Sequence, residues 1–427
     1  MVQEDAQLPE VTSAPLVPST SSDLFSALAT AFNSARGGLL SHAIKSAAKN
    51  TINTANHCDH YKNDTHRPYT SGLLNTIVKT FNSSLAERTL YDAAGVPKLG
   101  KKAAMLDLAN CLFRLYLKLR EHRIVTTIFD NLSSCGVPLE VPHFPRATLV
   151  TYHYYRGLHN LHNAAFLTSH AALTKSYALC SRRFIAQRRR ILVPLMSVSL
   201  ILGLIPHPDL FARPESTELR ELFTPIYIAI RRGDFRTFRQ GMGIEDALSE
   251  DTSWRQAFWL KHHVYYALCH RLQPQLWRGL IRRVALLKES AGPLMLRDVA
   301  VCARYVHLKQ PVATQPPNPL FHGPEPEDLV VRGEADDNSW FMDGLTLTVA
   351  DVEAAVESVL DQGFVKGYLA RLEGGPVLVL SKQEPFPKVW GVFEGGRWAA
   401  EEEAPTAVEE GVGRVVRLSG VKGIGEK

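Results

Sequence analysis

Two runs of β-forming residues follow a long stretch of chain in which apolar residues recur at helical spacing. They lie in "GFVKGYLARLEGGPVLVLSKQEPFP", residues 363–387, where Glu-Gly-Gly-Pro joins them. Short apolar runs that meet at a glycine-containing turn predict a β-hairpin. We therefore expect a mostly α-helical chain whose last folded unit ends in one hairpin.

The hairpin comes after a series of helical patterns, and three helices followed by a hairpin is the order of a winged helix, a helix-turn-helix variant. Thr348 with Asp351 predicts a capping box, and Gly363 predicts a C-cap before the hairpin. The second strand is apolar on both faces, so we expect helices or another chain to cover it. The patterns are "WRQAFWLKHHVYYALCHRL", "QLWRGLIRRVALLKES", "PLMLRDVAVCARYVH" and "LTVADVEAAVESVLDQG".

The first half of the chain reads as consecutive amphipathic helices. The pattern begins at Asp23 and recurs over 69–92, 101–119 and 122–134. Two later stretches, 149–173 and 225–242, each place two helices around a polar turn with a small residue nearby. Stacked helix pairs of this kind build solenoids. Their irregular spacing predicts a TPR-like, solenoid-like region rather than a strict repeat.

These patterns divide the chain into predicted domains. The predicted parts are a disordered N-terminus at 1–22, a helical-repeat region at 23–250, a winged-helix subdomain at 251–392 and a disordered tail at 393–427. A proline-rich, acidic stretch at 311–341 predicts a flexible insertion within the winged helix.

The charge is distributed unevenly along a chain whose net charge is +5. Residues 180–310 carry 21 Lys and Arg against 11 Asp and Glu, a net charge of +10. Residues 311–427 carry 10 against 20, a net charge of −10. The basic middle predicts contact with a polyanion or with an acidic protein.

Composition also favours a reducing compartment. The six cysteines form no short pairs, and residues 1–22 lack the pattern of a signal peptide. The longest apolar run, 191–206, is shorter than a bilayer span and predicts a buried helix. We expect a protein of the cytosol or the nucleus.

Five stretches resemble one branch of the PCI-domain family in their order and spacing. The branch holds PCI-domain-containing protein two and yeast Thp-one, with the signalosome-associated twelfth-subunit homologue as its sister. The resemblance covers residues 146–388 and departs from the branch at 311–341 and at Gln273-Pro274. The stretches are "YYRGLHNLHNAAFLTSHAALTKSYALCSRR", "RRRILVPLMSVSLILGLIPHPDLF", "AIRRGDFRTF", "LWRGLIRRV" and "QGFVKGYLARLEGGPVLVLSKQEPFP".

This resemblance implies a non-catalytic scaffold of the transcription-export complex two, in the nucleus at or near nuclear pores. It implies pairing with a larger Sac-three/GANP-type PCI scaffold and with a small acidic Sem/Dss-type protein, in the coupling of transcription to mRNA export. The alternative is the sister role, a signalosome-associated PCI subunit that acts in splicing or transcription with another PCI partner. Sequence features do not separate the two.

No motif indicates catalysis. The chain lacks a phosphate-binding Gly-x-x-x-x-Gly-Lys-Ser/Thr loop and a His-Glu-x-x-His pair. His57 and His60 lie in "HCDH", but no second cluster completes a set of metal ligands. We predict no enzyme activity, no cofactor and no metal site.

Basic side chains near the hairpin are candidates for nucleic-acid binding. Three lie on one helical pattern and three on or beside the wing, and winged helices often present such residues to phosphates. Ordinary solubilising charge is the other interpretation. We expect weak binding by the chain alone and binding of RNA and DNA alike by the assembled complex. The candidates are Arg278, Arg282, Arg283, Lys366, Arg371 and Lys382.

Two groups of residues are candidates for contact with protein partners. The apolar wing and its exposed edge offer a place for the larger scaffold to add a strand; its residues are Val377, Leu378, Val379 and Leu380. For the acidic partner, the candidates are the basic run Arg188, Arg189 and Arg190 and the aromatic anchors Trp254, Phe258 and Trp259. The other interpretations of this second group are a solvated helix face, a nuclear localisation signal or a nucleic-acid patch for the basic run, and core packing for the aromatic residues.

Overall fold

The structure is a computed structural model, and its contacts divide the chain into two compact units. The boundary lies between His159 and Asn160, within a single helix. Each unit is described by itself below. The structure describes residues 18–34, 36–61, 67–88, 90–91, 97–119, 121–140, 143–244, 254–288, 292–308, 347–372 and 374–395.

The first unit is helical, with one short pair of strands, and α4 lies at its centre. Nearly every turn of α4 is buried, and α2, α3 and α5 pack against it. The predicted helices at 101–119 and 122–134 are present, whereas the one predicted over 69–92 ends at Ala86. The elements are α1 (Pro18–Phe32), the 3₁₀ helix η1 (Gly37–Leu40), α2 (Ser41–Tyr61), α3 (Pro68–Ala86), β1 (Leu90–Tyr91), β2 (Pro97–Lys98), α4 (Lys102–Leu119), α5 (His122–Ser133) and α6 (Arg146–His162), which runs into the second unit.

The second unit begins with antiparallel helix pairs. Of the two helix-turn-helix stretches expected from the sequence, 225–242 forms the pair α10/α11, whereas 149–173 covers residues of α6 and α7. The helix α7 pairs with α8, in which the apolar run 191–201 is buried. Among the described residues, no helix is long and apolar enough to cross a membrane. The elements are α7 (Phe166–Leu179), α8 (Ile185–Ile201), α9 (Pro208–Phe211), the 3₁₀ helix η2 (Pro214–Ser216), α10 (Leu219–Arg232), α11 (Phe235–Met242), α12 (Trp254–Lys261) and α13 (Tyr265–Arg271).

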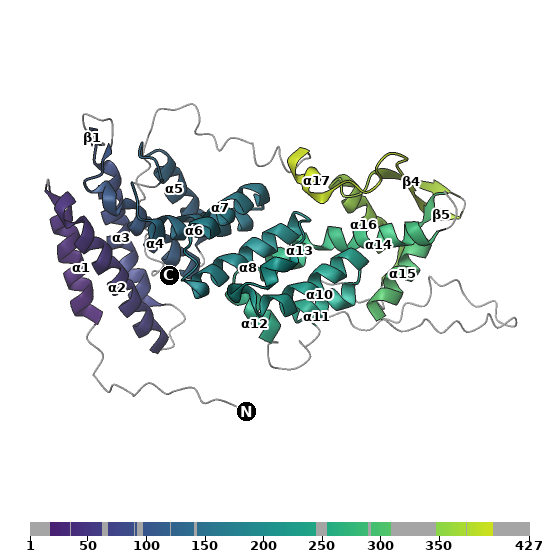
Figure 1. Ribbon diagram of the computed structural model, residues 1–427, viewed down its shortest axis with the longest axis horizontal. Helices are drawn as coiled ribbons and strands as arrows, with labels where there is room; N and C mark the ends of the chain where they lie inside the picture. The colour runs from purple at the N-terminus through teal and green to yellow at the C-terminus, as the bar shows by residue number, and fades with distance from the viewer. Residues whose placement is uncertain are drawn as a thin grey trace, which may run out of the picture. The chain divides into compact units, whose positions relative to one another are not determined.

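A winged helix completes the second unit (Figure 1). Its three helices pack on one another, and its antiparallel sheet has the order β3-β5-β4. The predicted capping box at Thr348 and Asp351 is present with both of its bonds, and Gly363 follows the helix with a φ of 78°. The elements are α14 (Gln273–Leu287), β3 (Leu294–Met295), α15 (Leu296–Leu308), α16 (Val349–Asp361), β4 (Gly367–Leu372) and β5 (Gly375–Leu380).

One further helix, α17 (Val389–Gly395), brings the chain back onto the helical pairs. The Phe393 ring lies 5.6 Å from that of Phe166 in α7 and 5.9 Å from that of Phe364. This helix was not predicted from the sequence, because a seven-residue segment with two glycines has a low helix propensity. Aromatic packing against α7 stabilises it.

The fold class is therefore mostly α, with helical pairs followed by a winged helix, as the sequence predicts. Two predicted boundaries need correction: α1 already begins at Pro18, and the predicted tail at 393–427 includes the last residues of α17. The predicted junction at 250/251 and the insertion at 311–341 lie outside the described residues. The remaining domain boundaries stay predictions.

Candidate functional site

Two glycines bring the arginines of α10 and α14 together. A Cβ on Gly279 of α14 would lie 2.4 Å from the carbonyl oxygen of Ile230 in α10. Gly233, which caps α10 with a φ of +63°, would place a Cβ 2.3 Å from the backbone nitrogen of Leu280. Only glycine fits at both positions, so main chain packs on main chain at this crossing.

The crossing lies beside a groove of about 420 Å³ that is lined by arginines and by apolar side chains. We call it the arginine groove. Below, its rim means Arg231, Arg278, Arg282 and Arg283, and its floor means its apolar lining, which includes Leu200, Leu204, Ile230 and Leu286. None of its lining residues is acidic. Two smaller hollows include Arg232 and Arg283, and one of them is also lined by the acidic Asp234.

The arginines are held by neutral groups rather than by carboxylates. Nη2 of Arg278 donates to the carbonyls of Phe386 at 3.2 Å and Pro387 at 2.8 Å, while its buried Nε has no partner. Arg231 donates to the Tyr227 hydroxyl at 3.0 Å, and Arg283 donates to the Arg232 carbonyl at 3.4 Å.

The lining of the arginine groove therefore carries a net positive charge. Within the described ranges, Arg231, Arg232, Arg278, Arg282 and Arg283 form no ion pair. Burial first, and then the charge of Arg282, lower the pKa of the Arg278 guanidinium. An anion in the groove would relieve both effects, because it would replace lost hydration and offset the repulsion.

The wing contributes less charge than the sequence analysis predicts. Lys366 lies 3.4 Å from Glu384, and Arg371 lies 3.1 Å from Glu353 of α16, so both are paired with carboxylates. Lys382 is exposed. Of the six predicted nucleic-acid residues, the structure brings Arg278, Arg282 and Arg283 together.

The third helix of the winged helix is acidic. In helix-turn-helix folds this element reads bases in the major groove. Here α16 carries Asp351, Glu353, Glu357 and Asp361 and neither Lys nor Arg. Major-groove reading by α16 is therefore disfavoured, and the arginine groove is the stronger candidate for contact with nucleic acid.

Sequence reasoning missed Arg231 and Arg232 as site residues. They lie in "AIRRGDFRTF", from which a helix pair and a resemblance to the PCI family were predicted, but no binding site. The signal that could have found them is the glycine that follows them, together with the glycine inside "WRGL". A pair of small residues on two arginine-bearing helices favours close approach of the helices and therefore of their charges.

The predicted wing interface needs correction. Val377 and Leu378 are 1% and 0% exposed, and Val379 and Leu380 are partly buried, because β5 is the central strand of the sheet. Of the two edge strands, β3 has only two residues, and β4 is the longer one, on which Tyr368 is 62% and Leu372 54% exposed. A partner strand can add only at an edge, so β4 replaces β5 as the candidate for strand addition.

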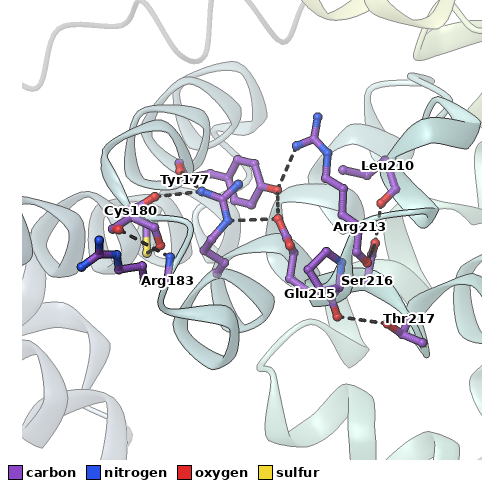
Figure 2. A network of polar contacts seen from close by, with 11 residues as sticks. Tyr177, Cys180, Arg183, Leu210, Arg213, Glu215, Ser216 and Thr217 are labelled. Carbon is purple, nitrogen blue, oxygen red and sulfur yellow. Dashed lines mark hydrogen bonds and ion pairs between the residues drawn. The ribbon is translucent and has the colours of Figure 1, made fainter.

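Arg188 is likewise not available to a partner, because it forms a buried network with α7 and η2 (Figure 2). Its Nε lies 3.0 Å from Oε1 of Glu215, and its Nη1 donates to the Cys180 carbonyl at 2.8 Å. The Tyr177 hydroxyl donates to the same Glu215 oxygen at 2.6 Å. Of the other two arginines, Arg189 pairs with Glu218, and Arg190 is exposed.

Two of the three aromatic candidates pack within the fold. Trp259 is fully buried, and its Nε1 donates to the Gly241 carbonyl at 3.2 Å. Phe258 is half-buried, with its ring 5.1 Å from that of Trp259. Trp254 is 62% exposed, so it alone presents most of its surface to a partner.

No group of side chains that could hold a metal ion occurs among the described residues. The site therefore offers guanidinium groups and apolar surface. This chemistry can bind phosphates or carboxylates through charge-assisted hydrogen bonds.

Helical pairs that run into a C-terminal winged helix define the PCI-domain architecture, which is that of a scaffold family. No family model matches the chain. A PCI domain-containing protein of Schizosaccharomyces pombe is 29% identical over 320 residues, which cover 75% of this chain and 61% of the relative. The PCI domain-containing protein 2 homologue of Drosophila melanogaster is 22% identical over 290 residues, 68% of this chain and 59% of the relative.

The sister branch is represented as well. The protein CSN12 homologue of Mycosarcoma maydis is 24% identical over 319 residues, 72% of this chain and 58% of the relative. The chain thus spans about three fifths of the length of these curated relatives. The predicted resemblance to the PCI-domain protein two branch and its CSN12-type sister is confirmed, and a PCI scaffold subunit is the function class that these relatives support.

Proposed function

We propose that this chain is the smaller PCI scaffold of a nuclear complex that couples transcription to mRNA export. It pairs there with a larger Sac-three/GANP-type PCI scaffold and with a small acidic Sem/Dss-type protein. It acts at or near nuclear pores, where the assembled complex binds RNA and DNA. The similarity to PCI domain-containing protein 2 homologues supports this proposal.

The observation that carries the nucleic-acid part is the arginine groove, whose arginines form no ion pair with any described residue. Guanidinium groups neutralise backbone phosphates and release counterions, which gives affinity without base preference. Three to five such contacts predict a dissociation constant on the order of micromolar or weaker at physiological salt. A partner winged helix beside this one would extend the basic surface and raise the affinity.

Charge reversal in the groove tests this part. We expect Arg282→Glu with Arg283→Glu to weaken RNA and DNA binding alike by the reconstituted complex. The salt dependence should flatten by about 1.8 for duplex or about 1.4 for single strands, because two phosphate contacts are lost. The measurement is fluorescence anisotropy across a salt series.

The matched control is Arg182→Glu with Arg183→Glu. These two arginines are also adjacent and exposed, and they do not line the groove. The control should keep the wild-type affinity and salt slope. Equal losses in both variants would mean that net charge, rather than the groove, sets the affinity.

A second candidate function is a signalosome-associated PCI subunit that acts in splicing or transcription. The CSN12 homologues among the relatives favour it. The two candidates differ in the large PCI partner. Affinity purification of the tagged full-length chain from nuclei, with identification of that partner, distinguishes them.

A further inference from the structure

The arginine groove has a feature that phosphate binding leaves unused. Much of its lining is apolar, including Leu200, Leu204, Ile230 and Leu286, and Leu286 is 75% exposed. A nucleic-acid backbone needs only the charged rim. The combination fits a ligand that carries apolar side chains next to several negative charges.

The chain itself carries such a segment directly after α17. Residues 396–406 read "GRWAAEEEAPT", with Trp398 and two alanines followed by Glu401, Glu402 and Glu403. We call this the acidic segment. Its three glutamates outnumber its one arginine, so its charge is complementary to that of the groove.

The path of the chain places this segment within reach. Val389, the first residue of α17, lines the arginine groove. The seven residues of α17 rise by about 10 Å. The extended chain from Gly395 to Glu401 spans up to about 20 Å. It is therefore long enough to run back along α17 to the groove beside Val389.

We propose that the acidic segment docks in the arginine groove of its own chain. Trp398 packs on the apolar floor, and Glu401–Glu403 face the rim, chiefly Arg231, Arg282 and Arg283. Phosphates and the acidic segment then compete for the same guanidinium groups. The docking itself does not depend on the proposed function, since it needs no nucleic acid and no partner.

A photo-cross-link in the full-length chain tests the docking. The photoreactive residue p-benzoylphenylalanine replaces Trp398, the dilute protein is irradiated, and the linked peptides are mapped by mass spectrometry. We expect cross-links within one chain to 227–231 and 275–286. The yield should fall at least about threefold with Glu401→Gln, Glu402→Gln and Glu403→Gln, because exposed ion pairs each contribute a few tenths of a kcal/mol or more.

The rim variant and its control complete the design. Arg282→Glu with Arg283→Glu should lower the yield to a similar degree, while Arg182→Glu with Arg183→Glu should leave it unchanged. Adding Glu401→Arg, Glu402→Arg and Glu403→Arg to the rim variant should restore it. The proposal would be overturned by cross-links to other surfaces or by cross-links only between two chains. It would also be overturned if substitution of the three glutamates left the cross-link yield unchanged. Anisotropy on the same proteins reports nucleic-acid binding separately.

Discussion

At the scale of single residues, the Arg188 network joins η2 to the turn between α7 and α8. The Arg188 and Glu215 side chains are 8% and 6% exposed. Burial acts to raise the pKa of Glu215, but hydrogen bonds from Tyr177 and Arg188 outweigh it and hold that pKa below the usual 4.5. Glu215 is therefore charged at neutral pH, and it depends on Arg188 for its balancing charge.

We expect Arg188→Met to destabilise the second unit by about 3 kcal/mol or more, because it leaves a buried carboxylate without its cation. Adding Glu215→Gln should recover part of the loss. All six tryptophans lie within 160–406, so denaturant unfolding followed by tryptophan fluorescence reports this unit alone. Arg189→Met, which breaks a more exposed pair, is the control and should leave the midpoint nearly unchanged.

A second residue, His262, should make stability depend on pH. Burial, and then the charges of Arg190, Lys261 and Arg189, lower its pKa to about 4. In the unfolded chain the pKa of His262 returns to about 6.5. Between about pH 4 and about pH 6.5 the unfolded state therefore binds a proton that the folded state does not bind. Stability should therefore fall as the pH drops from about 6.5 to about 4 and level off below.

The fall should amount to about 2–3 kcal/mol. It can be measured as the urea midpoint across that pH range. His262→Gln should flatten the curve. His207→Asn, at an exposed capping position, should keep the wild-type slope. A curve that His262→Gln does not change would place the titrating group elsewhere.

At the scale of elements, the crossing of α10 and α14 positions the groove. We expect Gly279→Ala to destabilise the second unit by about 1–3 kcal/mol, because its Cβ would meet a main-chain carbonyl that cannot turn away. It should also weaken nucleic-acid binding through misplaced arginines. Gly391→Ala, with open space around the added carbon, is the matched control in both unfolding and anisotropy. An unchanged Gly279→Ala protein would contradict the close crossing.

The edge strand β4 supports a prediction about the partner. We expect Tyr368→Glu with Leu372→Glu to weaken capture of the larger PCI scaffold on the order of tenfold, because strand addition would bury both new carboxylates without partners. Both side chains are exposed, so the variant should fold. Leu260→Glu with Tyr266→Glu, at exposed apolar positions on α12 and α13, is the control for pull-down. Full capture by the β4 variant would exclude this edge.

At the scale of the whole molecule, the elements with strong local signals could be predicted from the sequence. Helical spacing predicted the helical pairs, and the capping box and the glycine turn predicted α16 and the hairpin. The two residues of β3 carry no periodicity, and α17 depends on rings contributed by distant elements. The division at His159 lies inside a continuous helix, so no break in the sequence marks it.

Only the part of the candidate site that lies on one helix could be predicted from the sequence. Arg278, Arg282 and Arg283 are neighbours on one helix, so helical spacing alone joins them. Arg231 and Arg232 come to them only through the packing of α10 on α14. The basic run at 188–190 appears exposed in sequence because Glu215, which buries its first arginine, follows 27 residues later.

The contact of main chain with main chain at Gly233 and Gly279 also determines how the groove can choose its ligands. Side chains adjust their rotamers, but two backbones in contact leave no such freedom, so the spacing between the main-chain positions that carry the arginines of the two helices is fixed before any ligand arrives. A preorganised site loses little conformational entropy on binding. We therefore expect the affinity of the groove for an anionic chain to depend on the spacing between the negative charges of that chain. Chains whose charges are spaced more widely or more narrowly should bind more weakly.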